Sequence, residues 1–252
     1  MRESFSSFCD DFYLDMYVNT ELELPTSRDT ILAFFERVQK QFPSMGTFCR
    51  GQSKEYCLEG NRKSGQYRSV TLEADRIVSG YVNCEKFEDA YEQHRLVLEL
   101  IPYMLSVSHL DITSLDVTMA MEFDCRGNHD EVIAEALGSS GLTCLMDVAG
   151  VSVIDYSPSV VIALTPDNRT QGRISIESRT SVFDPRRPRQ NDSDDPISLS
   201  FTIRQYPRDS EKFDSVSSFT NQCRLIEELM EEKIIPSIVQ PLTNIIAQKR
   251  LT

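Results

Sequence analysis

The sequence lacks any apolar run that approaches the roughly 20 residues needed to cross a bilayer. Its first residues, MRESFSSFCDDFYLD, also lack the basic start and apolar centre of a secretory signal peptide. Hydrophobic residues make up 40% of the chain and charged residues 26%, which is an ordinary balance for a folded protein. We therefore expect a folded cytoplasmic protein without a membrane partner.

The common phosphate-binding and nucleophile motifs are also missing. Neither GxGxxG nor GxxxxGK[ST] occurs, which argues against the usual nucleotide-binding enzymes. No GxSxG nucleophile elbow is present, and the GSSG at 138–141 is more simply interpreted as the end of a helix.

Histidine is scarce, and cysteine is not arranged for metal binding. His94, His109 and His129 lie far apart and outside any HxxxH or HExxH pattern. We expect His94 to be a core residue and His129 to lie in the first turn of a helix. The seven cysteines include no CxxC, and the closest pair, Cys49 and Cys57, has no second pair to complete a zinc site. We therefore expect buried, reduced thiols, no metal or other cofactor, and no assigned catalytic residue.

An excess of positive charge is absent as well. The chain has 26 basic and 39 acidic residues, for a formal charge of −13. Binding to a phosphate backbone needs clustered Lys and Arg, so the composition argues against a nucleic-acid partner. The acidic surplus is explained either by solubility or by a basic protein partner.

The sequence does contain an internal repeat. LDMYVNTELE begins at Leu14 and LDVTMAMEFD begins at Leu115, and the match continues at one constant offset to Ala33 and Ala134. Asp15 corresponds to Asp116 in this alignment. The sequence therefore predicts a tandem duplication.

Both copies read as a strand followed by a helix. In the first, Leu14, Met16, Val18, Thr20 and Leu22 alternate with polar residues, so one face of the strand is expected to be buried. The second copy repeats the pattern at Leu115, Val117, Met119, Met121 and Phe123. TSRDTILAFFERVQKQFPS and GNHDEVIAEALGSSG then supply caps and apolar helix faces.

Each copy continues with several strands and a long helix. We expect strands at 47–52, 54–59, 67–74 and 76–82 in the first unit, and at 151–156, 160–165, 173–182 and 198–206 in the second. The closing helices are expected at 87–105 and 219–235. The units then span 1–106 and 107–252, with a polar loop at 184–196 that is expected to be exposed or mobile.

The predicted fold is α+β, with two β-α-β(3-4)-α units that form one antiparallel sheet covered by helices on one face. The order of elements resembles the half-saddle of the TATA-box-binding protein. This resemblance concerns topology alone, because no DNA-contacting residues carry over and the net charge has the opposite sign.

The polar side of the sheet supplies the candidate site. Alternation places Asp15, Glu21, Asp116 and Glu122 opposite the core, together with tyrosines and arginines. Tyrosine beside arginine and small hydroxyl groups is typical of protein-recognition surfaces. We expect a non-enzymatic binding or assembly protein that contacts a protein partner or a second copy. The alternative is an enzyme with an acidic cleft where the two units meet. The candidate binding residues are Tyr13, Asp15, Tyr17, Glu21, Asp116, Glu122, Arg204 and Tyr206.

Overall fold

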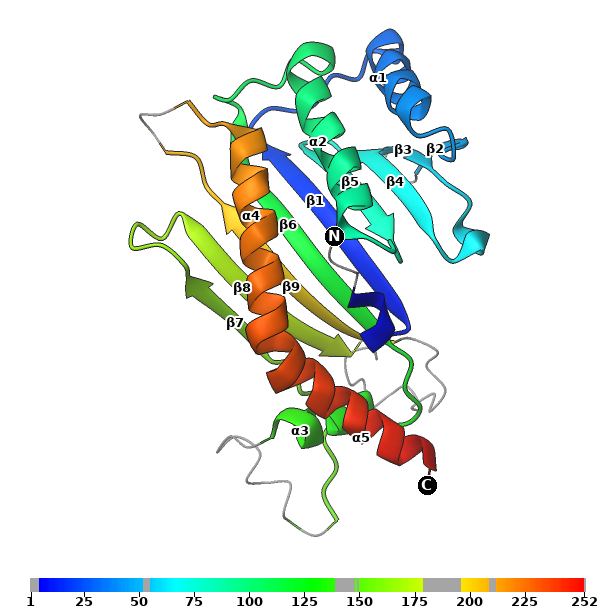
Figure 1. The fold of residues 1–252 in the computed structure, drawn as a ribbon, viewed down its shortest axis with the longest axis vertical. Helices are drawn as coiled ribbons and strands as arrows, with labels where there is room; N and C mark the ends of the chain where they lie inside the picture. Colours follow the sequence, from blue (N-terminus) through cyan, green and yellow to red (C-terminus); the bar gives the residue numbers. More distant parts are fainter. Residues whose placement is uncertain are drawn as a thin grey trace.

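A computed structural model describes residues 5–51, 55–138, 148, 150–178, 196–208 and 212–251. Within them the chain forms a nine-stranded antiparallel sheet in the order β2-β3-β4-β5-β1-β6-β9-β8-β7 (Figure 1). The mixed α+β class and the antiparallel sheet are as predicted. No described helix combines the length and the apolar character needed to cross a membrane.

The first part of the chain begins with a short 3-10 turn and ends with helix α2. Its elements are η1 (Phe5–Phe8), β1 (Asp11–Thr20), α1 (Arg28–Gln41), β2 (Thr47–Arg50), β3 (Tyr56–Glu59), η2 (Arg62–Ser64), β4 (Tyr67–Leu72), β5 (Arg76–Val82) and α2 (Phe87–Met104). The second part contains β6 (Ile112–Phe123), α3 (His129–Leu137), β7 (Ser159–Ala163), β8 (Thr170–Ser178), β9 (Ile197–Gln205), α4 (Ser215–Leu229), a π-helical segment (Met230–Val239) and α5 (Gln240–Leu251).

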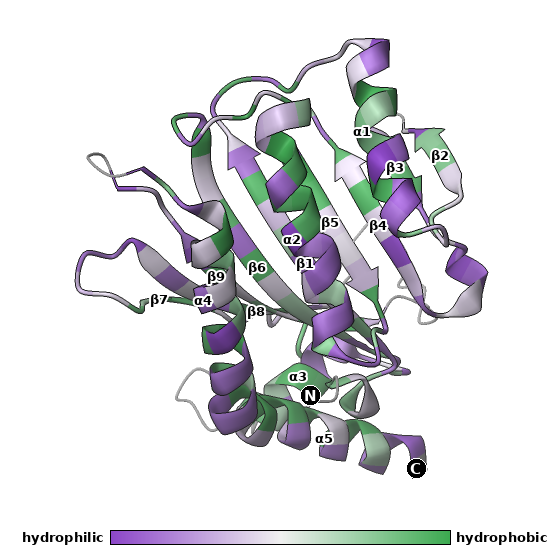
Figure 2. Ribbon diagram, turned by 45° about the horizontal axis from the view of Figure 1, so that its top comes forward, coloured by the Kyte–Doolittle hydropathy of each residue, from purple (hydrophilic) through white to green (hydrophobic). Residues whose placement is uncertain are grey.

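The two matching strands, β1 and β6, pair with each other at the centre of the sheet. Their apolar side chains face the helices, and Figure 2 shows the resulting alternation of hydropathy along the strands. Nine of the ten residues on the two faces predicted to be buried are buried: Leu14, Met16, Val18, Thr20, Leu115, Val117, Met119, Met121 and Phe123. Leu22 is an exception at 66% exposure, because β1 ends at Thr20, whose hydroxyl donates to the Leu22 carbonyl oxygen.

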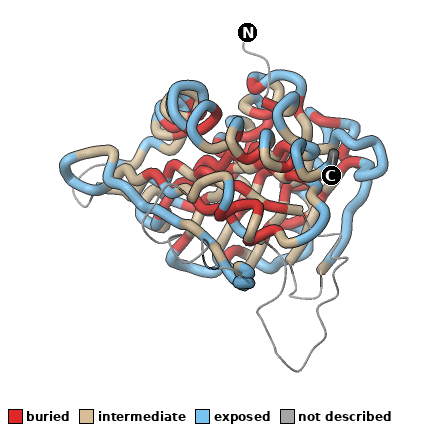
Figure 3. Tube along the Cα trace, turned by 90° about the horizontal axis from the view of Figure 1, so that it is seen from below, coloured by how far each residue is buried: buried red, intermediate tan, exposed pale blue. Residues whose placement is uncertain are grey.

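Helices cover the apolar face of the sheet, and the core lies between the two layers (Figure 3). Helix α1 begins after Ser27, whose side chain accepts a hydrogen bond from the Thr30 amide. Helix α4 buries Phe219, Cys223 and Ile226, and Met230 at the start of the π-helical segment continues the same buried stripe. Burial of these large side chains supplies the main driving force for folding.

Two predicted elements are wrong. Residues 151–156 form no strand, because this segment is hydrogen-bonded to the start of α3: Asn128 Nδ2 donates to the Val153 carbonyl and the Tyr156 amide donates to Asp130. The last helix was expected to stop at 235, but it continues to 251 through the π-helical segment. Pro236 lies inside that segment, whose wider turns are a known way to accommodate a helix irregularity.

The histidine predictions agree with the structure, and the cysteine prediction agrees in part. His94 is buried with Nδ1 2.8 Å from Ser79 Oγ, and burial lowers its pKa to about 3. His129 opens helix α3. No disulfide joins the six described cysteines, yet Cys49 is exposed on edge strand β2 rather than buried. The predicted polar loop lies outside the described residues except for Pro196.

Candidate functional site

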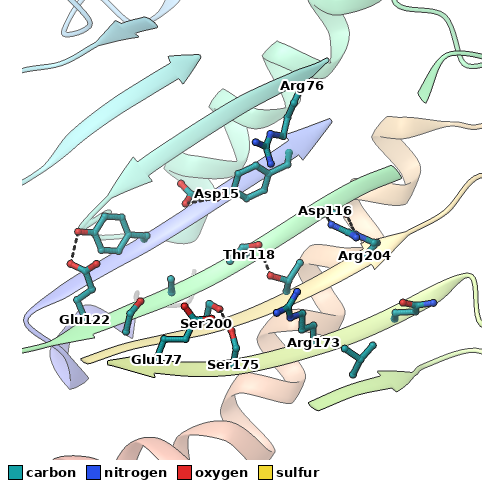
Figure 4. Close-up of a pocket in the computed structure, with 17 residues that line it drawn as sticks. Asp15, Arg76, Asp116, Thr118, Glu122, Arg173, Ser175, Glu177, Ser200 and Arg204 are labelled. Atoms are coloured by element: carbon teal, nitrogen blue, oxygen red, sulfur yellow. Dashed lines mark hydrogen bonds and ion pairs between the residues drawn. The ribbon is translucent and has the colours of Figure 1, made fainter. Parts of the chain in front are cut away.

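The polar face of the sheet forms an open groove of about 570 Å³ across β1, β6, β9 and β8 (Figure 4). The groove lies on the side opposite the helices, because the residues that line it alternate along each strand with the core residues. The described helices pack on the apolar face and leave this side uncovered. The groove is therefore the candidate site on the uncovered face of the sheet.

Small hydroxyl side chains form the floor of the groove. Strand register places Thr118 of β6 opposite Thr202 of β9, and their hydroxyl oxygens are 2.8 Å apart. Ser200 and Ser175 are paired in the same way between β9 and β8, at 2.9 Å. Because tyrosine, arginine and glutamate side chains stand around these short residues, the face is hollow rather than flat.

One ion pair is built into the centre of the groove. Arg204 binds Asp116 through two hydrogen bonds, Nε to Oδ1 at 2.8 Å and Nη2 to Oδ2 at 2.6 Å. The two residues are direct neighbours on β9 and β6, and Asp116 is only 4% exposed. The Asn19 amide also donates to Asp116, at 3.4 Å. The Asp116 charge is therefore compensated within the protein.

Two tyrosines are hydrogen-bonded to acidic side chains along β1. The Tyr13 hydroxyl donates to Glu122 at 2.9 Å, and the Tyr17 hydroxyl donates to Asp15 at 3.3 Å. Both phenol groups have a raised pKa, chiefly because burial disfavours the phenolate. Both tyrosines are thus half-buried, held by a hydrogen bond, and part of the lining of the groove.

Asp15 differs from Asp116 because no basic side chain among the described residues pairs with it. Its neighbour on β5 is Gly80, and a Cβ atom at that position would lie 2.5 Å from Asp15 Oδ1. The Asp15 carboxyl group therefore occupies space that is available only because residue 80 is glycine. Burial raises the pKa of Asp15 to about 7, and the hydrogen bond from Tyr17 offsets part of that shift.

The opposite rim of the groove carries charges without ion pairs. Arg173 and Glu177 lie on β8 and are exposed, and neither forms an ion pair with any described residue. Register places Asp15, Thr118, Thr202 and Arg173 in one row across four strands. At about 4.8 Å per strand, Asp15 and Arg173 are separated by about 14 Å along this row.

The structure brings six of the eight predicted site residues into the groove: Tyr13, Asp15, Tyr17, Asp116, Glu122 and Arg204. Glu21 lies outside it, because β1 ends one residue earlier and Glu21 is exposed in a bend. Tyr206 lies just beyond β9, in a neighbouring depression, with the Arg204 guanidinium 5.9 Å from its ring centre.

Several groove residues were not among the predicted site residues. These are Arg76, Thr118, Ala120, Val161, Gln171, Arg173, Ser175, Glu177, Ser198, Ser200 and Thr202. The strict alternation of Ser198, Ser200, Thr202 and Arg204 with apolar residues marks them as one face of a strand. That signal does not reveal that β9 would lie directly beside β6.

The groove offers hydrogen-bonding groups, fixed charges and tyrosine side chains. Within the described part of the chain, no cluster of three or more His, Cys, Asp or Glu side chains is arranged to hold a metal ion. The two central carboxyl groups of the groove also differ from each other, because Asp116 is ion-paired with Arg204 and Asp15 has no ion pair among the described residues. Such a surface suits recognition of a polar partner.

No protein-family model and no curated protein matches the chain. Among solved structures, the di-domain ARO/CYC StfQ from the steffimycin biosynthetic pathway aligns with 95% of this chain and 99% of its own. The identity is 6% and the TM-score is 0.22. A likeness at this level supports no inference about function, so the groove is interpreted from its own residues.

Proposed function

We propose that this protein is a non-enzymatic binding or assembly protein whose polar sheet face receives a protein partner. The observation that carries the proposal is the open groove, whose side chains are already held by hydrogen bonds before any partner arrives. A pre-organised surface loses little conformational freedom on binding. Half-buried tyrosine rings at its rim add contact area at a low entropic cost.

Exchange of two tyrosines tests this function. Tyr13→Ser with Tyr17→Ser is expected to weaken partner binding by about 1–2 kcal/mol per residue. Tyr103→Ser is the matched control, because Tyr103 is 89% exposed on helix α2, away from the groove. Affinity purification with quantitative mass spectrometry compares the partners retained by the three proteins, and melting temperatures confirm that each is folded.

A partner lost from the double variant but kept by Tyr103→Ser supports the groove as the binding surface. Equal retention by both variants contradicts the proposal. The cytoplasmic location and the absence of a nucleic-acid partner remain predictions from composition.

The alternative function, an enzyme with an acidic cleft, is favoured by one observation. Asp15 has a pKa near 7, which is suitable for a group that exchanges protons at neutral pH. Asp116 does not complete an acid pair with it, because Arg204 engages both Asp116 oxygens. An activity that is abolished by Asp15→Asn, with a rate profile that changes near pH 7, would establish this alternative.

We also propose that the chain is a tandem duplication with the topology of the TATA-box-binding protein. Support comes from the central register, in which Leu14 pairs with Met119 and Val18 pairs with Leu115. Exchanging each residue for its counterpart at the constant offset turns one of these pairs into the other. An experimental structure in which β1–α1 fails to superpose on β6–α3 would contradict the duplication.

A further inference from the structure

The carboxyl group of Asp15 lines the groove without a compensating positive charge. Its hydrogen-bond partner within the described residues is the neutral Tyr17 hydroxyl, at 3.3 Å. The guanidinium carbon of Arg76 lies 5.9 Å from the centre of the Tyr17 ring, but Arg76 is ion-paired with Glu73 at 2.6 Å. A half-buried carboxylate in this position is stabilised by any cation that enters the groove.

Asp116 shows, on the same face, which cation such a carboxylate accepts. Its neighbour toward the outer strands is Arg204, which binds it with two hydrogen bonds and also lies over the Tyr206 ring. The corresponding neighbour of Asp15 is Gly80, which has no side chain to offer. Asp15 therefore resembles Asp116 in its position on the polar face and in its tyrosine neighbours, but no arginine of the neighbouring strand pairs with it.

Other charges near Asp15 are already engaged. On the neighbouring strand β6, Glu122 accepts a hydrogen bond from Tyr13 of β1, and Asp116 is ion-paired with Arg204. From the outer side, Ser69 and Tyr67 of β4 contribute neutral hydroxyl groups. A cation that enters here meets a carboxyl group without a cationic partner, between two tyrosine side chains that also line the groove. A guanidinium group suits this setting, because its planar fork can donate two hydrogen bonds to one carboxylate.

We propose that Asp15, flanked by Tyr13 and Tyr17, binds an arginine side chain of the protein partner. This inference rests on the proposed function of the groove and names the chemistry of its partner. The net charge of −13 favours the approach of a basic segment. The bound guanidinium takes the role at Asp15 that Arg204 takes at Asp116.

The test uses N-acetyl-arginine amide as the probe and N-acetyl-citrulline amide as its uncharged analogue, each titrated into the isotope-labelled full chain. Chemical-shift changes at residues 13–17 are expected with the arginine probe and not with the citrulline probe. Asp15→Asn is expected to weaken the arginine probe at least tenfold. Glu36→Gln, which removes the same charge from the exposed side of helix α1, is expected to change its affinity less than twofold.

A second measurement does not depend on any variant. In the wild-type protein, affinity for the arginine probe is expected to fall as the pH is lowered from 8 to 5.5, because protonation removes the negative charge of Asp15. Equal binding of both probes, or equal loss of affinity in the two variants, overturns the inference. If the arginine probe fails but the tyrosine variants still lose the partner, the groove is a binding surface and only the arginine assignment is wrong.

Discussion

At the scale of single residues, Asp15 makes stability depend on pH in an unusual direction. Burial raises its pKa from 3.8 to about 7, so the folded protein holds this proton more tightly than the unfolded chain does. Between these two values the unfolded chain loses the proton first, and the folded state becomes progressively less stable as the pH rises. Above pH 7 the loss is complete and constant.

Asp15→Asn removes this loss while keeping the shape of the side chain and an oxygen that accepts the Tyr17 hydrogen bond. We expect the free energy of unfolding of the variant to exceed that of the wild type at pH 8 by about 2–4 kcal/mol. The difference should vanish near pH 4. Urea unfolding at both pH values measures it, and a variant that is less stable at pH 8 would show that the carboxylate is stabilised by contacts that the structure lacks.

Two arginines on the same face are expected to behave differently. Arg204→Leu leaves the buried Asp116 carboxylate without its two hydrogen bonds from the guanidinium, and the free energy of unfolding should fall by about 1–3 kcal/mol. Arg173→Leu is the matched control, because Arg173 is exposed and has no ion pair among the described residues, so its effect should stay within about 0.5 kcal/mol. Equal effects in denaturant titrations would mean that the ion pair contributes nothing measurable.

At the scale of elements, alternation predicted the central strands well. Leu14, Val18 and Leu115 face the core because a two-residue period leaves one register that buries all of them. The same period placed Asp15 and Asp116 on the polar side. Their different partners could not be predicted, because whether Arg204 or Gly80 lies beside them depends on the order of strands in the sheet.

The errors at element ends have local causes. The segment 151–156 has the composition of a strand, but side chains at the start of α3 take up its backbone groups. A proline normally marks the end of a helix. Pro236 lies instead where the helix widens into π-helical turns, a geometry that has no sequence signal.

Strand β7 forms one edge of the sheet and exposes all five of its residues. Val160, Val161 and Ile162 carry neither charge nor proline, the usual protection of an edge strand. We expect weak self-association through this edge at high concentration, and Ile162→Lys should abolish it. Leu110→Lys is the control, because Leu110 is 84% exposed in a turn away from any strand edge. Sedimentation velocity over a range of concentrations measures the self-association of each variant. If both variants associate equally, β7 is not the contact edge.

At the scale of the whole molecule, the two predicted units share their interior. Strands β1 and β6 pair along nearly their whole length, and the described residues form one hydrophobic cluster that spans both units. The long helices also meet, because the Tyr91 ring of α2 packs against Phe219 of α4 at 5.8 Å and the Tyr91 hydroxyl donates to Glu227. The boundary near residue 106 is therefore not a boundary of the core.

A shared core predicts one cooperative unfolding transition for the entire chain. Leu72→Ala in β4 and Leu199→Ala in β9 are matched substitutions of buried leucines, one in each unit. Each should lower the free energy of unfolding by about 2–5 kcal/mol. Each should also move the same single calorimetric peak to a lower temperature. Two peaks, each shifted by only one of the substitutions, would mean that the units unfold independently. In that case β1 could unfold while β6, β9 and β8 stayed folded, and the groove would lose its β1 side. The number of transitions therefore also decides whether Asp15 of β1 and Arg173 of β8 belong to one rigid site.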